Sequence, residues 1–129
     1  MIIKNPRLLR EFRRAVRCEH CKRPMLYGCD PHHHKPKGMG GGSCLDIRIN
    51  LISLCRECHD DVGQGIPECT ILLLIAVREG ALQDDIDAVR NLILRLPKDA
   101  RPWQLDRERE GLNVAQQKLL DRTLKETTR

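Results

Sequence analysis

Apolar residues recur at helical spacing near the start of the chain, and they predict an N-terminal helix. The apolar stripe consists of Leu8, Leu9, Phe12 and Val16. Residues three and four apart share one face of a helix, so this stripe would pack against a core. Asn5 is a suitable N-cap and Pro6 a suitable first helical residue. We therefore expect the helix to begin there and to continue to residue 17.

The middle of the chain has the spacing of strands. Apolar residues alternate with polar ones at Leu45, Ile47, Ile49 and Leu51, as in a half-buried strand. An earlier strand is expected to end at the histidines 32–34, and the glycine run 40–42 is expected to connect the two strands. A short helix through His59 is predicted after the second strand. The predicted order is strand, loop, strand and helix.

The second half of the chain is predicted to be helical. One helix is expected to end at residue 80, and a second is expected over residues 83–96, before a proline. Three aspartates near the start of the second helix would repel phosphates: Asp84, Asp85 and Asp87. We therefore expect these two helices to pack together or to contact another protein rather than to bind DNA. One further helix is expected within the highly charged residues 104–129.

The excess positive charge is concentrated in the first predicted helix. The chain has 23 Lys and Arg against 18 Asp and Glu, a net charge of +5, and residues 1–17 hold six basic residues and one acidic residue. One helical face would carry a row of arginines: Arg7, Arg10, Arg14 and Arg17. Such a row suits a phosphate backbone, although a solvated face that only maintains solubility fits the charge equally well.

Four of the seven cysteines form two closely spaced pairs. Cys18 and Cys21 form one Cys-x2-Cys pair, Cys55 and Cys58 form the other, and 33 residues separate them. Two such pairs hold one tetrahedral Zn²⁺, because each short spacing lets two thiolates of one turn converge on the ion. Four thiolates leave no open coordination position. The predicted zinc is therefore structural.

The other cysteines are interpreted from the compartment that the sequence suggests. No apolar stretch reaches the roughly 20 residues needed to cross a bilayer, and the first residues lack the apolar region of a secretory signal. A cytoplasmic protein is expected, and there cysteines are more often metal ligands or free thiols than disulfides. Cys29, Cys44 and Cys69 are expected to be small buried thiols, with Cys29 an alternative zinc ligand.

Several motifs lie in order within and just after the cysteine pairs. They are Asp30-Pro31-His32-His33, Gly41-Gly42, Asn50-Leu51-Ile52-Ser53-Leu54-Cys55 and Cys58-His59. In this order and spacing, residues 18–63 resemble the HNH endonucleases with paired zinc knuckles, many of which are phage or bacterial proteins. The resemblance implies an α+β fold with a ββα-metal core, flanked here by the N-terminal and C-terminal helices. It also implies a metal-dependent endonuclease that hydrolyses DNA, and double-stranded DNA is the expected substrate.

The resemblance assigns roles to four residues by their motif positions. His32 and His59 would hold a catalytic divalent cation, and His33 would be the general base that takes a proton from water. Histidine suits this task because its unperturbed pKa is about 6.5. Asn50 would hold the imidazole of the base. In a register shifted by one residue, which stays open, His33 would be the ligand and His34 the base.

One residue differs from the pattern of the HNH family. Many members carry a second histidine in the helix, four residues after the first. Here that position is Gly63. Water, phosphate oxygens and the carboxylates of Asp30, Asp60 or Asp61 would complete the metal shell. Such a site suits Mg²⁺ or Mn²⁺, hard ions that retain several waters. An inactive zinc-stabilised module that binds nucleic acid or protein is the alternative.

The sequence divides into four parts on this interpretation. Residues 1–17 form a basic N-terminal helix, 18–66 a zinc-stabilised nuclease core, 67–97 a helical pair, and 98–129 a charged C-terminal helix or tail. Lys35 and Lys37 would contact the phosphates of the scissile strand together with the arginine row. A protein partner, if there is one, would bind through residues 67–129.

Overall fold

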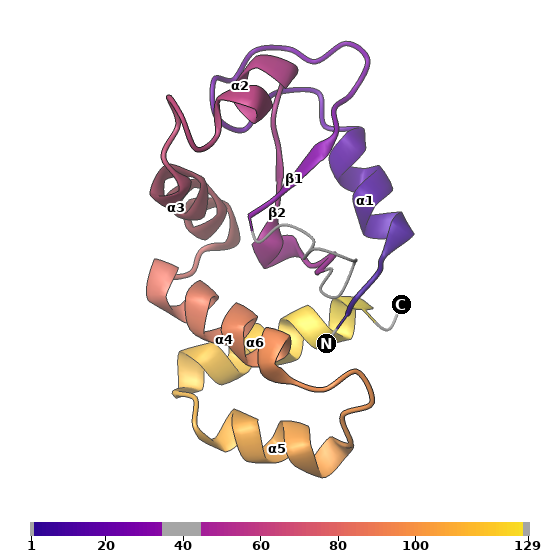
Figure 1. The fold of residues 1–129 in the computed structure, drawn as a ribbon, viewed down its shortest axis with the longest axis vertical. Coiled ribbons are helices and arrows are strands. Elements are labelled where there is room, and N and C mark those ends of the chain that lie inside the picture. Colours follow the sequence, from indigo (N-terminus) through magenta and orange to yellow (C-terminus); the bar gives the residue numbers. More distant parts are fainter. Residues whose placement is uncertain (1, 35–44, 128–129) are drawn as a thin grey trace.

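Helices surround a small antiparallel sheet in the computed structural model, which describes residues 2–34 and 45–127 (Figure 1). The strands are β1 (Pro31–His33) and β2 (Leu51–Ser53). The helices are α1 (Pro6–Arg13), α2 (Arg56–Asp61), α3 (Glu68–Glu79), α4 (Gln83–Arg95), α5 (Pro102–Glu110) and α6 (Val114–Thr127). The expected α+β class is confirmed, and the described residues are mainly helical.

Helix α1 begins as predicted but ends earlier. The Asn5 side chain accepts a hydrogen bond from the Leu8 amide at 3.2 Å, which is the expected N-cap. The helix ends at Arg13 rather than at residue 17, and the Val16 side chain is 76% exposed. The Val16 carbonyl accepts from the Met25 amide at 2.8 Å. Pairing with a later segment therefore replaces the last predicted turn.

The two strands pair in a register that places the histidines opposite apolar residues. His32 lies opposite Ile52, and His33 lies opposite Leu51. Leu51 packs with Leu8 and Phe12 of α1, whereas Ile52 belongs to the main core. Alternate residues of β2 therefore join α1 on one side and the rest of the fold on the other.

The prediction of one long strand over residues 45–51 is wrong. Arg48–Asn50 form a 3-10 turn, closed by the Asn50 amide donating to the Ile47 carbonyl at 2.9 Å, and β2 begins only after it. Leu45, Ile47 and Ile49 are all buried, as the alternation indicated. Apolar residues at every second position are compatible with a turn here, because neighbouring segments pack against this part of the chain from several sides. Ile3 forms a parallel bridge with Leu45.

The helical half follows the prediction up to residue 96. Helix α3 ends at Gly80, which adopts a left-handed conformation with φ of 65°. Four residues of α3 are buried, namely Ile71, Leu72, Ile75 and Ala76. The helix contains an apolar run over residues 71–77, but Leu73 and Val77 of this run are exposed, so the run is only partly buried.

The charged C-terminal segment folds as two helices rather than one. A reciprocal pair of hydrogen bonds starts α6: Gln116 N donates to Asn113 Oδ1 at 2.8 Å, and Asn113 N donates to Gln116 Oε1 at 3.2 Å. Arg109 of α5 forms an ion pair with Asp121 of α6 at 2.7 Å. The cap therefore ends the expected continuous helix, and the ion pair joins the two resulting pieces.

One hydrophobic cluster extends from Ile3 to Leu120 and includes residues of β2, α2, α3, α4 and α6. The sheet region and the helical half therefore share apolar packing. Helix α5 lies farthest from the sheet in Figure 1 and contributes no fully buried residue. Among the described residues, every helix is too short or too polar to span a bilayer.

We predict that Gly80→Ala lowers the free energy of unfolding by about 1 kcal/mol, because a side chain disfavours the left-handed conformation at this helix end. A Cβ at Gly80 would meet no atom within 4 Å, so the effect isolates the backbone. Gly111, with φ of −75°, provides the matched control. Urea unfolding should show Gly111→Ala to be neutral or slightly stabilising; equal losses in both variants would contradict the prediction.

Candidate functional site

The four paired cysteines meet in space. One sulfur atom from each of Cys18, Cys21, Cys55 and Cys58 lies within 4.8 Å of the other three. Three of these residues are buried, and Cys21 is exposed. The predicted convergence of the two pairs is confirmed, and this donor set is compatible with one tetrahedral Zn²⁺.

Each pair is presented by a local backbone feature. Cys18–Cys21 lie on a tight turn, in which the Cys21 amide donates to the Cys18 sulfur at 3.5 Å. The turn closes with Lys22 in a left-handed conformation, φ 66°. Cys55 is the N-cap of α2, and Cys58 lies within its first turn. The second pair thus comes from the start of a helix that directly follows β2.

The electrostatics of the cluster favour a bound cation. Burial raises the pKa of Cys55 and of Cys58, and the neighbouring thiols raise the pKa of Cys58 further. For Cys18, burial also raises the pKa, but hydrogen bonds from the amides of Cys55 and Cys21 outweigh it and lower the value to about 7. Several thiolates held this closely repel one another, so a divalent ion would stabilise their ionised forms.

Glu19, inside the first pair, connects the cluster to the sheet. Its carboxylate accepts from the Ser53 amide at 2.6 Å and from the Arg78 guanidinium at 2.9 Å. Its own amide donates to the Ser53 carbonyl at 2.9 Å. The first cysteine turn is therefore fixed to the end of β2 and to α3.

The remaining cysteines differ in their surroundings. Cys29 is half-buried, and its thiol donates to the Phe12 carbonyl at 3.4 Å, so it is not part of the four-cysteine cluster. Cys69 is exposed, which corrects the expectation of a buried thiol; it lies in the first turn of α3, on the solvent side. Cys44 lies outside the described residues.

His32 of β1 and His59 of α2 lie side by side. Their ring centroids are 5.2 Å apart, with the ring planes at 89° to each other. His59 follows Cys58 directly, so the cysteine cluster places the backbone of His59 close to β1. The structure therefore brings together the two histidines that were expected to share a cation.

The ring of His32 has a buried nitrogen that no group among the described residues satisfies. Its Nε2 atom is buried and has no hydrogen-bond partner within the described chain. Burial, and then the charges of His59 and His33, lower the pKa of His32 to about 4. The ring is consequently neutral at physiological pH, which is the form that binds a metal.

The other two members of the histidine run point to different partners. His33 Nε2 lies 2.8 Å from Asp46 Oδ1. His34 Nδ1 lies 3.1 Å from Glu68 Oε2 at the start of α3. The sequence interpretation did not include Asp46 in the site. Only its position four residues before Asn50 was available as a signal.

Asn50 is fully buried at the junction of the 3-10 turn and β2. Its side-chain amide donates to the Leu45 carbonyl at 3.0 Å, and its own carbonyl accepts from the His34 amide at 2.9 Å. These bonds brace the segment that faces the histidines. The predicted hydrogen bond between Asn50 and the His33 imidazole stays a prediction.

A cleft of about 740 Å³ opens beside His59. Two basic and two acidic side chains line it: Arg13, Arg56, Asp30 and Asp60. The third expected carboxylate, that of Asp61, accepts from the Gly65 amide at 3.2 Å and closes the turn after α2. Gly63 lies in this turn with φ of 86°, beyond the end of the helix. A histidine there would not share a helical face with His59.

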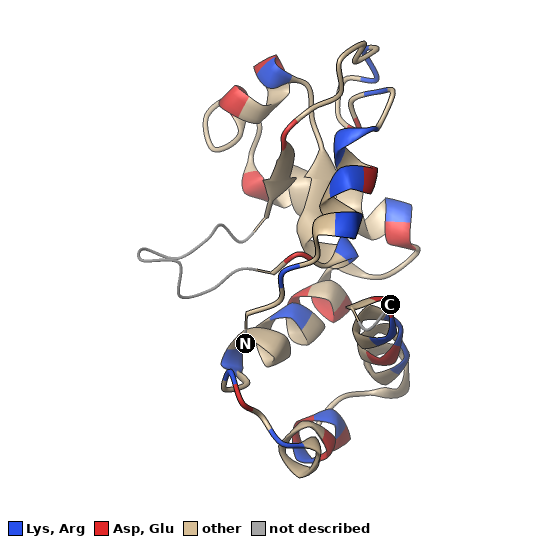
Figure 2. Cartoon of the chain, turned by 90° about the vertical axis from the view of Figure 1, so that its right-hand side faces the viewer, with Lys and Arg blue, Asp and Glu red and all other residues tan. Residues whose placement is uncertain are grey.

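The row of four arginines is only partly formed. Arg7 and Arg10 are exposed on α1, and Arg14 caps its end. Arg17 lies beyond the helix and donates to the Lys22 carbonyl at 3.0 Å, which corrects its expected place in the row. Figure 2 turns α1 toward the viewer and shows basic residues along it. Lys35 and Lys37 lie outside the described residues.

No protein-family model matches the sequence, no curated protein is significantly similar to it, and no solved structure gives a significant match. The function is therefore inferred from the residues and their geometry.

We predict that purified chain contains about one zinc ion, and that Cys58→Ser loses the ion together with several kcal/mol of stability, because binding free energy at such a site is folding free energy. Elemental analysis and thermal unfolding would measure both quantities. The exposed Cys69 provides a matched control, since Cys69→Ser should keep the ion and the unfolding temperature. Zinc-free protein of unchanged stability would contradict the prediction.

Proposed function

We propose that this chain is a metal-dependent endonuclease of the HNH type that hydrolyses phosphodiester bonds of double-stranded DNA. The observation that carries the proposal is the meeting of His32 and His59, with His33 as the next residue of β1, on a strand pair and helix joined by the four cysteines. The zinc ion expected at the cysteines would have a structural role, because four thiolates occupy a tetrahedral site completely.

His32 and His59 fit a divalent cation. The buried Nε2 atom of His32, which has no partner in residues 2–34 and 45–127, is the group that a metal would satisfy. Carboxylates of Asp30 and Asp60 line the adjoining cleft, and such oxygen donors suit Mg²⁺ or Mn²⁺. When bound, the cation would neutralise the charge that grows on the phosphate and on the leaving oxygen.

His33 would act as the general base. It takes a proton from a water molecule, the water oxygen bonds to phosphorus, and the bond from phosphorus to the 3′ oxygen breaks. The leaving oxygen takes its proton from solvent. The alternative register, in which His34 is the base, is disfavoured because the His34 side chain is only 9% exposed, against 16% for His33.

The basic surface beside the cleft supports DNA as the substrate. Helix α1 lies next to β1, the strand that carries the histidines (Figure 1). Arg13 at the end of α1 and Arg56 at the start of α2 both line the cleft. These guanidinium groups suit phosphates on either side of the scissile bond.

We expect the wild-type chain to nick plasmid DNA with Mg²⁺ or Mn²⁺ and not with EDTA, whereas His33→Ala should lose at least about 100-fold in rate, because it lacks the base. His34→Ala is the matched control and should retain most of the activity. Equal cleavage by wild type and His33→Ala would refute the assignment. Loss in His34→Ala alone would establish the shifted register.

The arginines of α1 should bind DNA through phosphates. Each phosphate contact that is lost lowers the slope of log K against log salt by about 0.9, so Arg10→Ala/Arg14→Ala should weaken binding and flatten that slope by up to about 2. Lys98→Ala/Arg107→Ala removes the same charge from exposed positions near α5. Fluorescence anisotropy with a short duplex would compare them, and identical slopes in the two variants would contradict the prediction.

A second candidate function is binding to another protein through residues 67–129. A groove of about 750 Å³ between α3, α4 and α6 has an apolar lining that includes the exposed side chains of Leu73, Val77 and Leu82. An inactive module of this kind would cleave no plasmid with either metal. The nicking assay therefore separates the two candidates.

A further inference from the structure

Asp46 lies buried between the histidine strand and the start of the chain. The residue is 2% exposed, and both of its carboxylate oxygens have partners. Oδ1 lies 2.8 Å from His33 Nε2, and Oδ2 accepts from the Asn5 amide at 2.9 Å. The carboxylate therefore bridges His33 and the N-cap residue of α1.

The bridge is held by the backbone on both sides. The Asp46 amide donates to the Ile3 carbonyl at 2.9 Å, next to the parallel bridge between Ile3 and Leu45. Asn5, which donates to the carboxylate, also caps α1 through its side chain. The backbone of Asp46 is thus fixed by a main-chain bond, and the Asn5 amide holds its carboxylate in place beside the imidazole.

We propose that Asp46 is the positioning residue of His33, and that it holds the ring so that Nδ1 is the atom which accepts the proton from water. The proposal rests on the function proposed above. A carboxylate only accepts hydrogen bonds, so the ring nitrogen facing it carries the hydrogen, and the lone pair lies on the other nitrogen. Asp46 orients the ring and does not touch the substrate.

The contacts of Asp46 with His33 and with the Asn5 amide make one substitution especially informative. An asparagine has one oxygen, and the fixed amide of Asn5 requires that oxygen as its acceptor. The amide NH2 group of Asp46→Asn would then face His33 Nε2 and donate to it. The ring hydrogen would move to Nδ1, where it blocks the nitrogen that must accept the proton.

Kinetics of plasmid nicking provide the first test. Asp46→Asn should lower kcat by about 10- to 100-fold, the range typical for residues that orient a ligand or base, with KM little changed. The matched control is Asp85→Asn, because Asp85 is also buried and accepts from Gln116 at 3.0 Å, on the helical half of the chain. This control should keep wild-type kcat.

The tautomer of His33 provides a readout that a merely structural role would not move. Long-range ¹H–¹⁵N spectra of the imidazoles, recorded on the zinc-loaded protein without added Mg²⁺ or Mn²⁺ at a pH where the rings are neutral, distinguish hydrogen on Nε2 from hydrogen on Nδ1. The His33 signals are assigned by their absence in His33→Ala. We expect hydrogen on Nε2 in the wild type and on Nδ1 in Asp46→Asn.

Each outcome decides the proposal. A lower kcat in Asp46→Asn with the changed tautomer supports it, and wild-type kcat or an unchanged tautomer in a folded Asp46→Asn variant overturns it. If the wild type cleaves no DNA, the proposed function fails. In that case the tautomer of His33 in the wild type still tests whether Asp46 orients the ring. Hydrogen on Nδ1 of the wild-type ring would overturn that role.

Discussion

The convergence of the four cysteine sulfurs is the constraint on which the candidate site depends. It brings residues on either side of a 33-residue interval to within 4.8 Å of one another. Cys55 ends the segment that follows β2, and Cys58 directly precedes His59. Because both belong to the cluster, the start of α2 has one position relative to the strands, and His59 meets His32 there. A metal at this cluster would stabilise the site without taking part in its chemistry.

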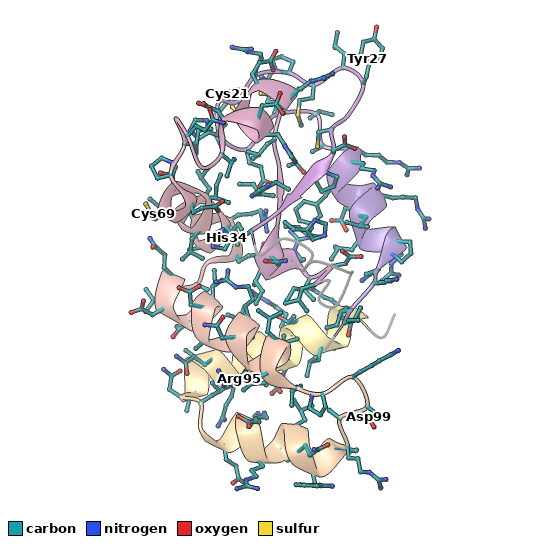
Figure 3. All side chains as sticks on the ribbon, viewed as in Figure 1. Cys21, Tyr27, His34, Cys69, Arg95 and Asp99 are labelled. Atoms are coloured by element: carbon teal, nitrogen blue, oxygen red, sulfur yellow. The ribbon has the colours of Figure 1, made fainter. Side chains whose placement is uncertain are left out.

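Polar groups inside the fold connect this cluster to the basic helix. Figure 3 shows His34 within the fold and Cys21 at the end occupied by α2. Glu19 joins the first cysteine turn to β2 and to Arg78 of α3, while the Arg78 guanidinium lies 5.0 Å from the centre of the Phe12 ring of α1. At the opposite end of α1, Asp46 joins the helix cap to His33. The start of the basic helix is therefore tied to the histidine strand, and its end to α3, which Glu19 joins to the first cysteine turn.

Local patterns predicted most helices well because caps and apolar periodicity act over a few residues. Asn5 and Gly80 mark helix ends in the sequence and in the structure. Two failures occur where another segment packs against the backbone in question. Met25 pairs with Val16 and shortens α1, and burial from several sides turns residues 48–50 into a 3-10 helix instead of a strand. The Asn113 cap was a local signal, but the continuous charge pattern of residues 104–129 concealed it.

The sequence by itself determined the donor set at the cysteines, because Cys-x2-Cys spacing confines two sulfurs to one turn wherever it occurs. It also determined that His32 lies on a strand and His59 on the helix that follows the second strand. Only the tertiary structure decided that their rings lie 5.2 Å apart, that Arg17 leaves the arginine row, and that Asp46 faces His33. The last contact joins residues 13 positions apart and needs the N-terminal segment as well. No local periodicity encodes such a meeting, since it arises from how separate segments pack together.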